Sequence, residues 1–315
     1  MMRTTVHFAT NRVVDNPADA IGGYRAAIVP SPAAMTYGTA LVEGIDLDTN
    51  AQGVVSQIAA TSVGRFPEQA IGDLADAGRD LLVFVHGFDN TFSDAITRAA
   101  FNREWLAASG AAAADTTVVA FSWPSKGQIA EVPDLEGDYR FDQSMARNSA
   151  LHLMTFLANL EPILSAARKH RQRSILLAHS MGNLALQGAV ESWFQHGNGD
   201  AVMFDHAILA AADCDYDTFA QPGTALSGLV RLAARVAIYY SRADRVLDLS
   251  EVLNLTRRLG QNGPRDRADA AAFPPAQYLM EDCSAYRDYD VGFLNSHQYY
   301  RQSKQVRALI AANIV

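Results

Sequence analysis

Several features that mark other classes of protein are scarce in this sequence. It has two cysteines among 315 residues, too few for a disulfide framework, so we expect Cys214 and Cys283 to be reduced and buried. No stretch approaches the ~18 consecutive apolar residues of a membrane span. The 26 basic residues are outnumbered by 34 acidic ones and form no dense cluster, which argues against nucleic acid or an anionic membrane as a partner.

Motifs for secretion, metals and phosphates are also missing. The first ten residues lack the apolar stretch and cleavage site of a signal peptide, so we expect a soluble cytoplasmic protein unless an export signal has been removed. There is no H-x-x-x-H or C-x-x-C spacing and no glycine-rich phosphate loop after a strand, and the acidic run Asp213, Asp215 and Asp217 has no EF-hand continuation. We therefore expect neither a metal nor a cofactor.

The sequence does have enough apolar residues for a large core, 49% of the chain, in short β-rich runs that alternate with helical patterns. This alternation predicts an α/β fold with a mostly parallel central sheet and helices on both faces. The early runs Thr5–Ala9, Tyr24–Val29 and Thr39–Ile45 follow one another too closely for β-α-β units, so we expect antiparallel strands at the N-terminal edge. We expect residues 1–315 to form one domain.

The later elements follow the same alternation. We predict strands over Leu81–Val85, Thr117–Phe121, Ser174–Leu177, Phe204–Ala211 and Val236–Tyr240, and helices over Thr91–Ala108, Gln143–Lys169, a segment ending at Gly197, and Arg301–Ile314. Asn90 and Asp142 are expected to cap the first two of these helices. Two stretches, Pro124–Tyr139 and Gly260–Phe293, are expected to be long loops that shape the entrance to a site at the carboxyl ends of the strands.

The most informative stretch is Ala178-His179-Ser180-Met181-Gly182, which follows the apolar run Ser174–Leu177. It predicts a strand, a sharp turn and a helix with Ser180 at the apex, the nucleophile-elbow arrangement of serine hydrolases. Small residues two positions before and after the serine fit the tight turn, although Ala178 stands where glycine is usual. We expect His179 to point away from Ser180 and to pack inside the fold.

A serine nucleophile needs a histidine base, which follows both the serine and the carboxylate along the chain in hydrolases of this type. Only His196, His206 and His297 follow Ser180. His196 lies about fifteen residues, or about 22 Å, along the elbow helix and cannot reach. His206 begins a strand and so lies at the opposite end of the sheet. His297, before the last helix, is therefore the candidate base, the alternative being a surface histidine that caps that helix.

The carboxylate partner has more candidates. Asp244 follows the strand Val236–Tyr240, which is the expected place for the third member of a triad, and we predict that it is the acid. Each candidate could instead be a solvated loop carboxylate or a helix cap. The alternatives are Asp213 and Asp215 after the preceding strand, Asp248 in the helix expected just after Asp244, and Asp282.

Attack on a carbonyl builds negative charge on its oxygen, which N–H donors stabilise. The stretch Val85-His86-Gly87-Phe88 ends a buried strand and turns toward a helix, like the loop that supplies one such donor in lipases. We expect the backbone N–H groups of Phe88 and Met181 to form this oxyanion hole, with His86 bonded to loop backbone. Phe88 and Trp123 are candidates for the pocket wall, although Trp123 could equally just close its strand.

Together these motifs resemble the α/β-hydrolases, and more narrowly a bacterial branch of that superfamily whose function is unknown. The resemblance spans nearly the whole chain and implies a serine hydrolase with Ser180 as nucleophile, His297 as base and Asp244 as acid. It implies little about the substrate. The segments that carry it are residues 8–12 (FATNR), 85–88 (VHGF), 121–125 (FSWPS), 179–183 (HSMGN), 208–213 (ILAAAD), 239–244 (YYSRAD) and 297–300 (HQYY).

The leading hypothesis is a carboxylic ester hydrolase that forms an acyl-enzyme on Ser180 and acts on a small-molecule ester. We expect short to medium acyl chains, because no long apolar lid helix is visible. The same triad would support amide or thioester hydrolysis, or acyl transfer to an alcohol. A third alternative is a non-catalytic binding protein with a hydrolase fold, against which the three filled triad positions argue. Dehalogenase or epoxide hydrolase chemistry is disfavoured, because the elbow would then carry Asp.

Overall fold

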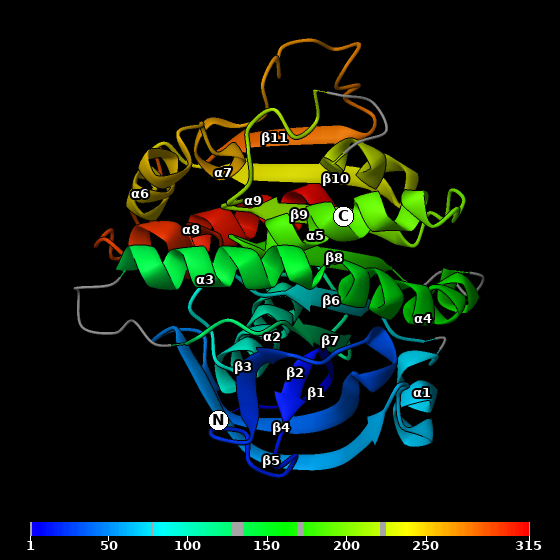
Figure 1. The fold of residues 1–315 in the computed structure, drawn as a ribbon. Helices are drawn as coiled ribbons and strands as arrows, with labels where there is room; N and C mark the ends of the chain where they lie inside the picture. The colour runs from blue at the N-terminus through cyan, green and yellow to red at the C-terminus, as the bar shows by residue number, and fades with distance from the viewer. Residues whose placement is uncertain (1, 77, 128–134, 169–172, 221–224, 315) are drawn as a thin grey trace.

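The computed structural model describes residues 2–76, 78–127, 135–168, 173–220 and 225–314 (Figure 1). Its strands are β1 (Met2–Thr10), β2 (Arg12–Val14), β3 (Tyr24–Ile28), β4 (Thr36–Asp46), β5 (Ala51–Val63), β6 (Leu81–Val85), β7 (Thr117–Ser122), β8 (Ser174–His179), β9 (Phe204–Ala210), β10 (Ala233–Tyr240) and β11 (Tyr278–Asp282). Its α-helices are α1 (Glu68–Leu74), α2 (Phe92–Ala108), α3 (Leu135–Asn148), α4 (Ala150–Arg168), α5 (Gly182–Gln195), α6 (Arg245–Asn254), α7 (Leu259–Asn262), α8 (Tyr299–Gln302) and α9 (Lys304–Ile314). Short 3-10 helices are η1 (Pro32–Ala34), η2 (Ala225–Arg231) and η3 (Asn295–Gln298).

Nine of the strands form one sheet, in the order β11-β10-β9-β8-β6-β7-β1-β4-β5. The strands from β11 to β1 run parallel, whereas β4 and β5 pair antiparallel at the edge next to β1. The predicted α/β fold with a mostly parallel sheet and antiparallel N-terminal edge strands is therefore confirmed. Because parallel strands share a direction, the loops after β6, β8, β9 and β10 emerge at the same edge of the sheet.

Helices cover both faces of this sheet (Figure 1), and the side chains of β6 show why. Successive strand residues point to opposite faces. Leu81, Val83 and Val85 join a core with α4 and α5, whereas Leu82 and Phe84 join a second core with α2 and α9. All five residues of β6 are buried, so the strand reads as a continuous apolar run.

Several predicted elements differ in detail from the observed ones. Tyr24–Ile28 forms a separate two-stranded sheet with β2, because β4 occupies the antiparallel position beside β1. Gly260–Phe293 was expected to be a loop, yet it includes most of α7 and the edge strand β11, which pairs with β10. The sequence pattern also did not predict β5, which extends the sheet beyond β4.

The long helix predicted over Gln143–Lys169 is two helices, α3 and α4, with the break at Ser149. The Ser149 hydroxyl donates to the carbonyl of Met145 at 2.7 Å and accepts from Asn11 Nδ2, which diverts the turn. Helix α3 also begins at Leu135, inside the expected loop Pro124–Tyr139; residues 128–134 of that loop, and Lys169, lie outside the described residues.

Cys214 and Cys283 are both free and buried, as the sequence predicts. Within the described ranges, no helix combines the length and the apolar character that crossing a membrane requires.

Candidate active site

Ser180 lies at the sharp turn between β8 and α5. Its backbone adopts a left-handed conformation with φ +54°, which is rare for a residue with a side chain. The turn is held by the Ser180 N–H, which donates to the carbonyl of Ala210 at 3.0 Å. At Gly182 a Cβ atom would come 2.4 Å from the carbonyl oxygen of His86, so this position requires glycine. These features give Ser180 the strained elbow geometry that exposes a serine side chain above a parallel sheet.

Ser180, His297 and Asp244 form a line of hydrogen bonds. Ser180 Oγ lies 2.7 Å from His297 Nε2, and His297 Nδ1 lies 2.6 Å from Asp244 Oδ2. His297 Nδ1–H donates to the Asp244 carboxylate, so Nε2 carries no proton and accepts a hydrogen bond from the Ser180 hydroxyl. The structure thus brings together the three residues that the sequence proposed as nucleophile, base and acid, and all three are buried.

Asp244 is also the N-cap of α6. Its side chain therefore both caps a helix and bonds to the histidine, two roles that the sequence leaves as alternatives. Its Oδ1 accepts from the backbone N–H groups of Val246 and Leu247, each at 3.1 Å, and its Oδ2 faces His297. Burial raises the pKa of the Asp244 carboxyl, while the charge of His297 and these hydrogen bonds oppose the rise. The backbone donors fix the carboxylate so that Oδ2 points at the imidazole ring.

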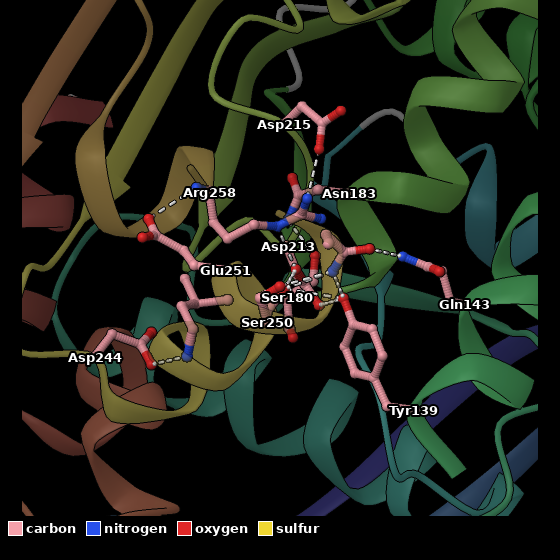
Figure 2. Close-up of polar contacts among 12 residues, drawn as sticks. Tyr139, Gln143, Ser180, Asn183, Asp213, Asp215, Asp244, Ser250, Glu251 and Arg258 are labelled. Carbon is pink, nitrogen blue, oxygen red and sulfur yellow. Dashed lines mark hydrogen bonds and ion pairs between the residues drawn. The ribbon is translucent and has the colours of Figure 1, made fainter. Parts of the chain in front are cut away.

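The alternative acid Asp213 belongs to a different network (Figure 2). Its carboxylate accepts from Tyr139 Oη at 3.0 Å, Ser250 Oγ at 2.5 Å and Arg258 Nε at 2.8 Å. Its backbone N–H donates to the carbonyl of Ser180 at 3.0 Å. Asp213 therefore supports the main chain of the elbow. The remaining candidates bond elsewhere: Asp215 with Arg258, Asp248 with Gln261, and Asp282 with Ser284.

The excluded histidines lie where the sequence places them. His196 is the C-cap of α5, and His206 is in the first half of β9. His179 is packed inside: its ring lies 4.7 Å from that of Tyr300, and its Nε2 donates to the carbonyl of His297 at 3.2 Å. Burial holds the pKa of His179 well below its ordinary value, so it is a neutral neighbour of His297.

The loop after β6 packs directly against the elbow. At Gly87 a Cβ atom would come 2.6 Å from Ser180 Cβ, so only glycine lets this backbone approach so closely. Within the described ranges, no acceptor is found for the N–H of Phe88 or of Met181. Both groups flank Ser180 in sequence or in space, as donors to a developing oxyanion must.

His86 and Asn90 hold this loop in place. The Trp123 N–H donates to His86 Nε2 at 3.0 Å, so Nδ1 carries the proton and donates to the carbonyl of Gly87 at 2.9 Å. Asn90 Nδ2 donates to the carbonyls of Gly87 and Phe88. The expectation that Asn90 caps α2 is wrong, because Thr91 and Asp94 form a capping box there. His86 bonds loop backbone, as expected.

Asp142 and Arg12 also bond to the loops after β6 and β7, and the sequence pattern did not predict these roles. Asp142 was expected to begin a helix, but it lies within α3 and accepts from the N–H groups of Asp89 and Lys126. Arg12 is fully buried and donates to the carbonyls of Asn90 and Ser125. Arg12 lies in a segment that carries the family resemblance, which is the signal that could have marked it.

A cavity of ≈ 560 Å³ opens over Ser180. Phe88 lines it, whereas Trp123 is fully buried behind the loop and stacks on His86. From the two stretches expected to shape the entrance, Leu135, Tyr139 and Phe293 contribute. In the part of the chain that the structure describes, no cluster of His, Cys, Asp and Glu side chains has the makings of a metal site.

Residues 68–313 match the family described as alpha/beta hydrolase of unknown function (DUF900). No curated protein matches the sequence.

The solved structures to which the chain is similar include three hydrolases of very low sequence identity. An esterase from Pyrobaculum calidifontis is 13% identical, with 75% of this chain and 76% of that chain covered and a TM-score of 0.35. An alpha/beta hydrolase from the metagenome of Lake Arreo, Spain, is 11% identical over 90% and 80%, with a TM-score of 0.38. The RedJ thioesterase of prodiginine biosynthesis in Streptomyces coelicolor is 12% identical over 76% and 87%, with a TM-score of 0.33.

Proposed function

Because this chain belongs to the DUF900 family of alpha/beta hydrolases, we propose that it is a serine carboxylic ester hydrolase with Ser180 as nucleophile. The observation that carries the proposal is the continuous hydrogen-bond line from Asp244 through His297 to Ser180 at the base of the cavity. A serine, a histidine and a carboxylate in this order are the groups that acyl transfer requires.

The proposed reaction begins when Ser180 Oγ attacks the ester carbonyl carbon and its proton passes to His297 Nε2. Asp244 stabilises the imidazolium through the bond to Nδ1–H. The Phe88 and Met181 N–H groups hold the oxyanion of the tetrahedral intermediate. His297 then gives its proton to the departing alkoxide, which leaves an acyl-enzyme on Ser180. Water, deprotonated by His297, hydrolyses that ester and restores the serine.

The cavity wall supports a substrate of modest size. Much of it is apolar, and a volume of ≈ 560 Å³ suits a small ester with a short to medium acyl chain better than a long lipid. The apolar lining residues are Phe88, Leu135, Val246, Leu249, Phe293 and Leu294.

Hydrolysis of p-nitrophenyl esters of increasing acyl length tests the proposal. Ser180→Ala should lower kcat/KM by at least about three orders of magnitude, because the attacking atom is removed. Ser192→Ala, the same change near the C-terminal end of α5, is the matched control and should retain activity. A fluorophosphonate probe should label the wild type and the control but not Ser180→Ala.

Three outcomes would contradict the proposal. Turnover that survives in Ser180→Ala would exclude this serine as the nucleophile. Labelling of Ser180 without release of p-nitrophenol from any ester would instead favour amide or thioester hydrolysis or acyl transfer. Absence of labelling would favour a non-catalytic binding protein.

A further inference from the structure

The cavity over Ser180 is lined in part by polar side chains, two of which are arginines that the proposed reaction does not use. Arg98 comes from α2 and Arg301 from α8, and both line the cavity together with Asp89 and Gln298. Gln298 directly follows His297 and accepts from Arg301 Nε at 2.8 Å. These polar side chains, here called the polar wall, thus line the same cavity as the imidazole of His297.

Arg98 is a partly buried guanidinium that has no partner among the residues the structure describes. Its Nε atom is buried and has no hydrogen-bond partner among the described residues. Over the same ranges, Arg98 forms no ion pair. Buried donors in folded proteins are nearly always satisfied, by water or a ligand where not by protein. An arginine left in this state in a cavity wall is therefore prepared for an acceptor from outside the chain.

Arg301 is 5% exposed, and its charge also lacks a protein counter-ion. The amide oxygen of Gln298 is a neutral acceptor, and the guanidinium carbon of Arg301 lies 5.8 Å from the ring centre of Phe101. Burial and the charge of Arg98 lower the pKa of Arg301 to about 10, so it stays protonated at neutral pH. No described carboxylate lies within ion-pair distance of it.

The carboxylates around the cavity do not neutralise this pair. Asp213 is paired with Arg258, and Asp244 faces His297. Asp89 remains, with a pKa that burial and the charge of Asp142 raise to about 6, so it is ionised at neutral pH. Two arginines and one aspartate leave one positive charge in the described wall, which matches a single negative charge on a ligand.

We propose that the substrate is an ester that also carries a carboxylate group, and that Arg98 and Arg301 bind this carboxylate while the ester lies at Ser180. The proposal rests on the proposed function, whose substrate class it specifies. Guanidinium groups hold carboxylates through paired, charge-assisted hydrogen bonds. A dianionic phosphate fits less well, because Asp89 would repel the second charge.

Two p-nitrophenyl esters with the same skeleton test this selectivity. One is mono-p-nitrophenyl adipate, which ends in a free carboxylate, and the other has that carboxylate capped as a methyl ester. Wild-type kcat/KM at pH 7.5 should favour the anionic ester by about tenfold or more, the range expected of hydrogen bonds to a charged group. The preference should fall mainly on KM, because the carboxylate binds alike in the ground and transition states.

Two variants that change the charge of the cavity wall in opposite directions make the test more specific. Arg98→Gln should reduce the ratio of the two kcat/KM values toward one, and Asp89→Asn should increase it. Arg147→Gln, an exposed arginine on α3 outside the cavity, is the matched control and should leave the ratio as in the wild type. Arg98 is chosen over Arg301 because Arg301 is buried and its Nε also donates to Gln298, so its replacement would disturb the residue next to His297.

A binding measurement separates this proposal from the proposed function. Calorimetry with the Ser180→Ala variant should detect monomethyl adipate but only weakly dimethyl adipate, and the difference should vanish when Arg98→Gln is added. Such binding without turnover by the wild type would support the carboxylate site and overturn the ester hydrolase. Turnover with no anionic preference, or binding that does not depend on Arg98, would overturn the carboxylate site and leave the hydrolase standing.

Discussion

Asp89 is a side chain whose surroundings disfavour its charge. Its pKa lies near 6 for the reasons given above, and its Oδ1 has no hydrogen-bond partner in the described ranges. In an unfolded chain an aspartate titrates near 3.9. The folded protein therefore binds this proton more tightly, and the contribution of Asp89 to the free energy of unfolding falls as the pH rises from about 4 to about 6.

Asp89→Asn removes this unfavourable charge while keeping a residue that tolerates the left-handed backbone, φ +56°, at this position. The free energy of unfolding at pH 7.5 should rise by about 1–2 kcal/mol, less than the full shift implies because the group is partly exposed to solvent. At pH 4 the gain should nearly vanish. Urea unfolding at pH 7.5 and pH 4 measures this gain, and Asp217→Asn, a change at an exposed aspartate, is the control. An equal gain at the two pH values would show that the pKa of Asp89 is not raised in the folded protein.

For single residues, the sequence predicts where a side chain lies in the fold better than it predicts the groups that surround it. The elbow pattern and the chain order of serine, carboxylate and histidine place Ser180, Asp244 and His297 after strands that end at one edge, where they meet. Their catalytic roles stay predictions until they are measured. Arg98 could not be singled out, because which arginine of a helix faces a cavity depends on how that helix is rotated in the packed fold.

At the scale of the elements, one buried arginine links the loop after β9 to the helices α6 and α7. Arg258, the N-cap of α7, is 2% exposed and donates to the carboxylates of Asp213 and Asp215. Ser250 of α6 donates to the same Asp213 carboxylate. A buried charge is costly when it is unpaired, so loss of either partner leaves the other uncompensated.

Arg258→Gln should lower the free energy of unfolding by about 3–5 kcal/mol, since the buried carboxylate of Asp213 would lose its cation. Ester turnover should fall as well, because the Asp213 N–H supports the Ser180 carbonyl. Arg257→Gln, an exposed neighbour, should change stability by less than about 0.5 kcal/mol. Chemical denaturation compares the two; similar small losses would show that the Asp213 pair is not structurally important.

The elements that sequence reasoning missed share a physical cause. The interruption at Ser149 depends on a hydrogen bond to Asn11, far away in sequence, which local periodicity does not contain. Strand β5 has no fully buried residue because it is the sheet edge, so it lacks the apolar signal by which the strands of the sheet centre were found. Local patterns predicted the buried strands β6 to β10, where burial on both faces makes the signal strong.

For the whole molecule, the first 67 residues lie outside the segment that matches the family, yet they are built into the sheet and the site. Strand β1 pairs with β7 on one side and β4 on the other. Arg12 follows β1 and reaches the loops after β6 and β7. That all 315 residues form one domain stays a prediction, but the contacts of Arg12 make the N-terminal segment part of the site's support.

Arg12→Gln should lower both stability, by about 3 kcal/mol, and ester turnover, because the carbonyls of Asn90 and Ser125 would lose their donor and the Phe88 loop would loosen. Arg3→Gln is the matched control on the same segment, since Arg3 is exposed and forms only a surface ion pair with Glu43. Unfolding in urea and kcat/KM with a neutral ester measure the two effects. Full activity in Arg12→Gln would show that this loop keeps its shape without the arginine.

The stacking of Trp123 on His86 gives the molecule an optical property. The rings are parallel with centroids 4.9 Å apart, and all three tryptophans are buried. A protonated imidazole quenches indole fluorescence, but burial keeps the pKa of His86 well below its ordinary value, so the ring beside Trp123 is neutral. The emission of Trp123 should therefore stay bright across neutral and mildly acidic pH and respond mainly to movement of the loop that carries Phe88. Trp123 should therefore serve as a fluorescent probe of the position of this loop.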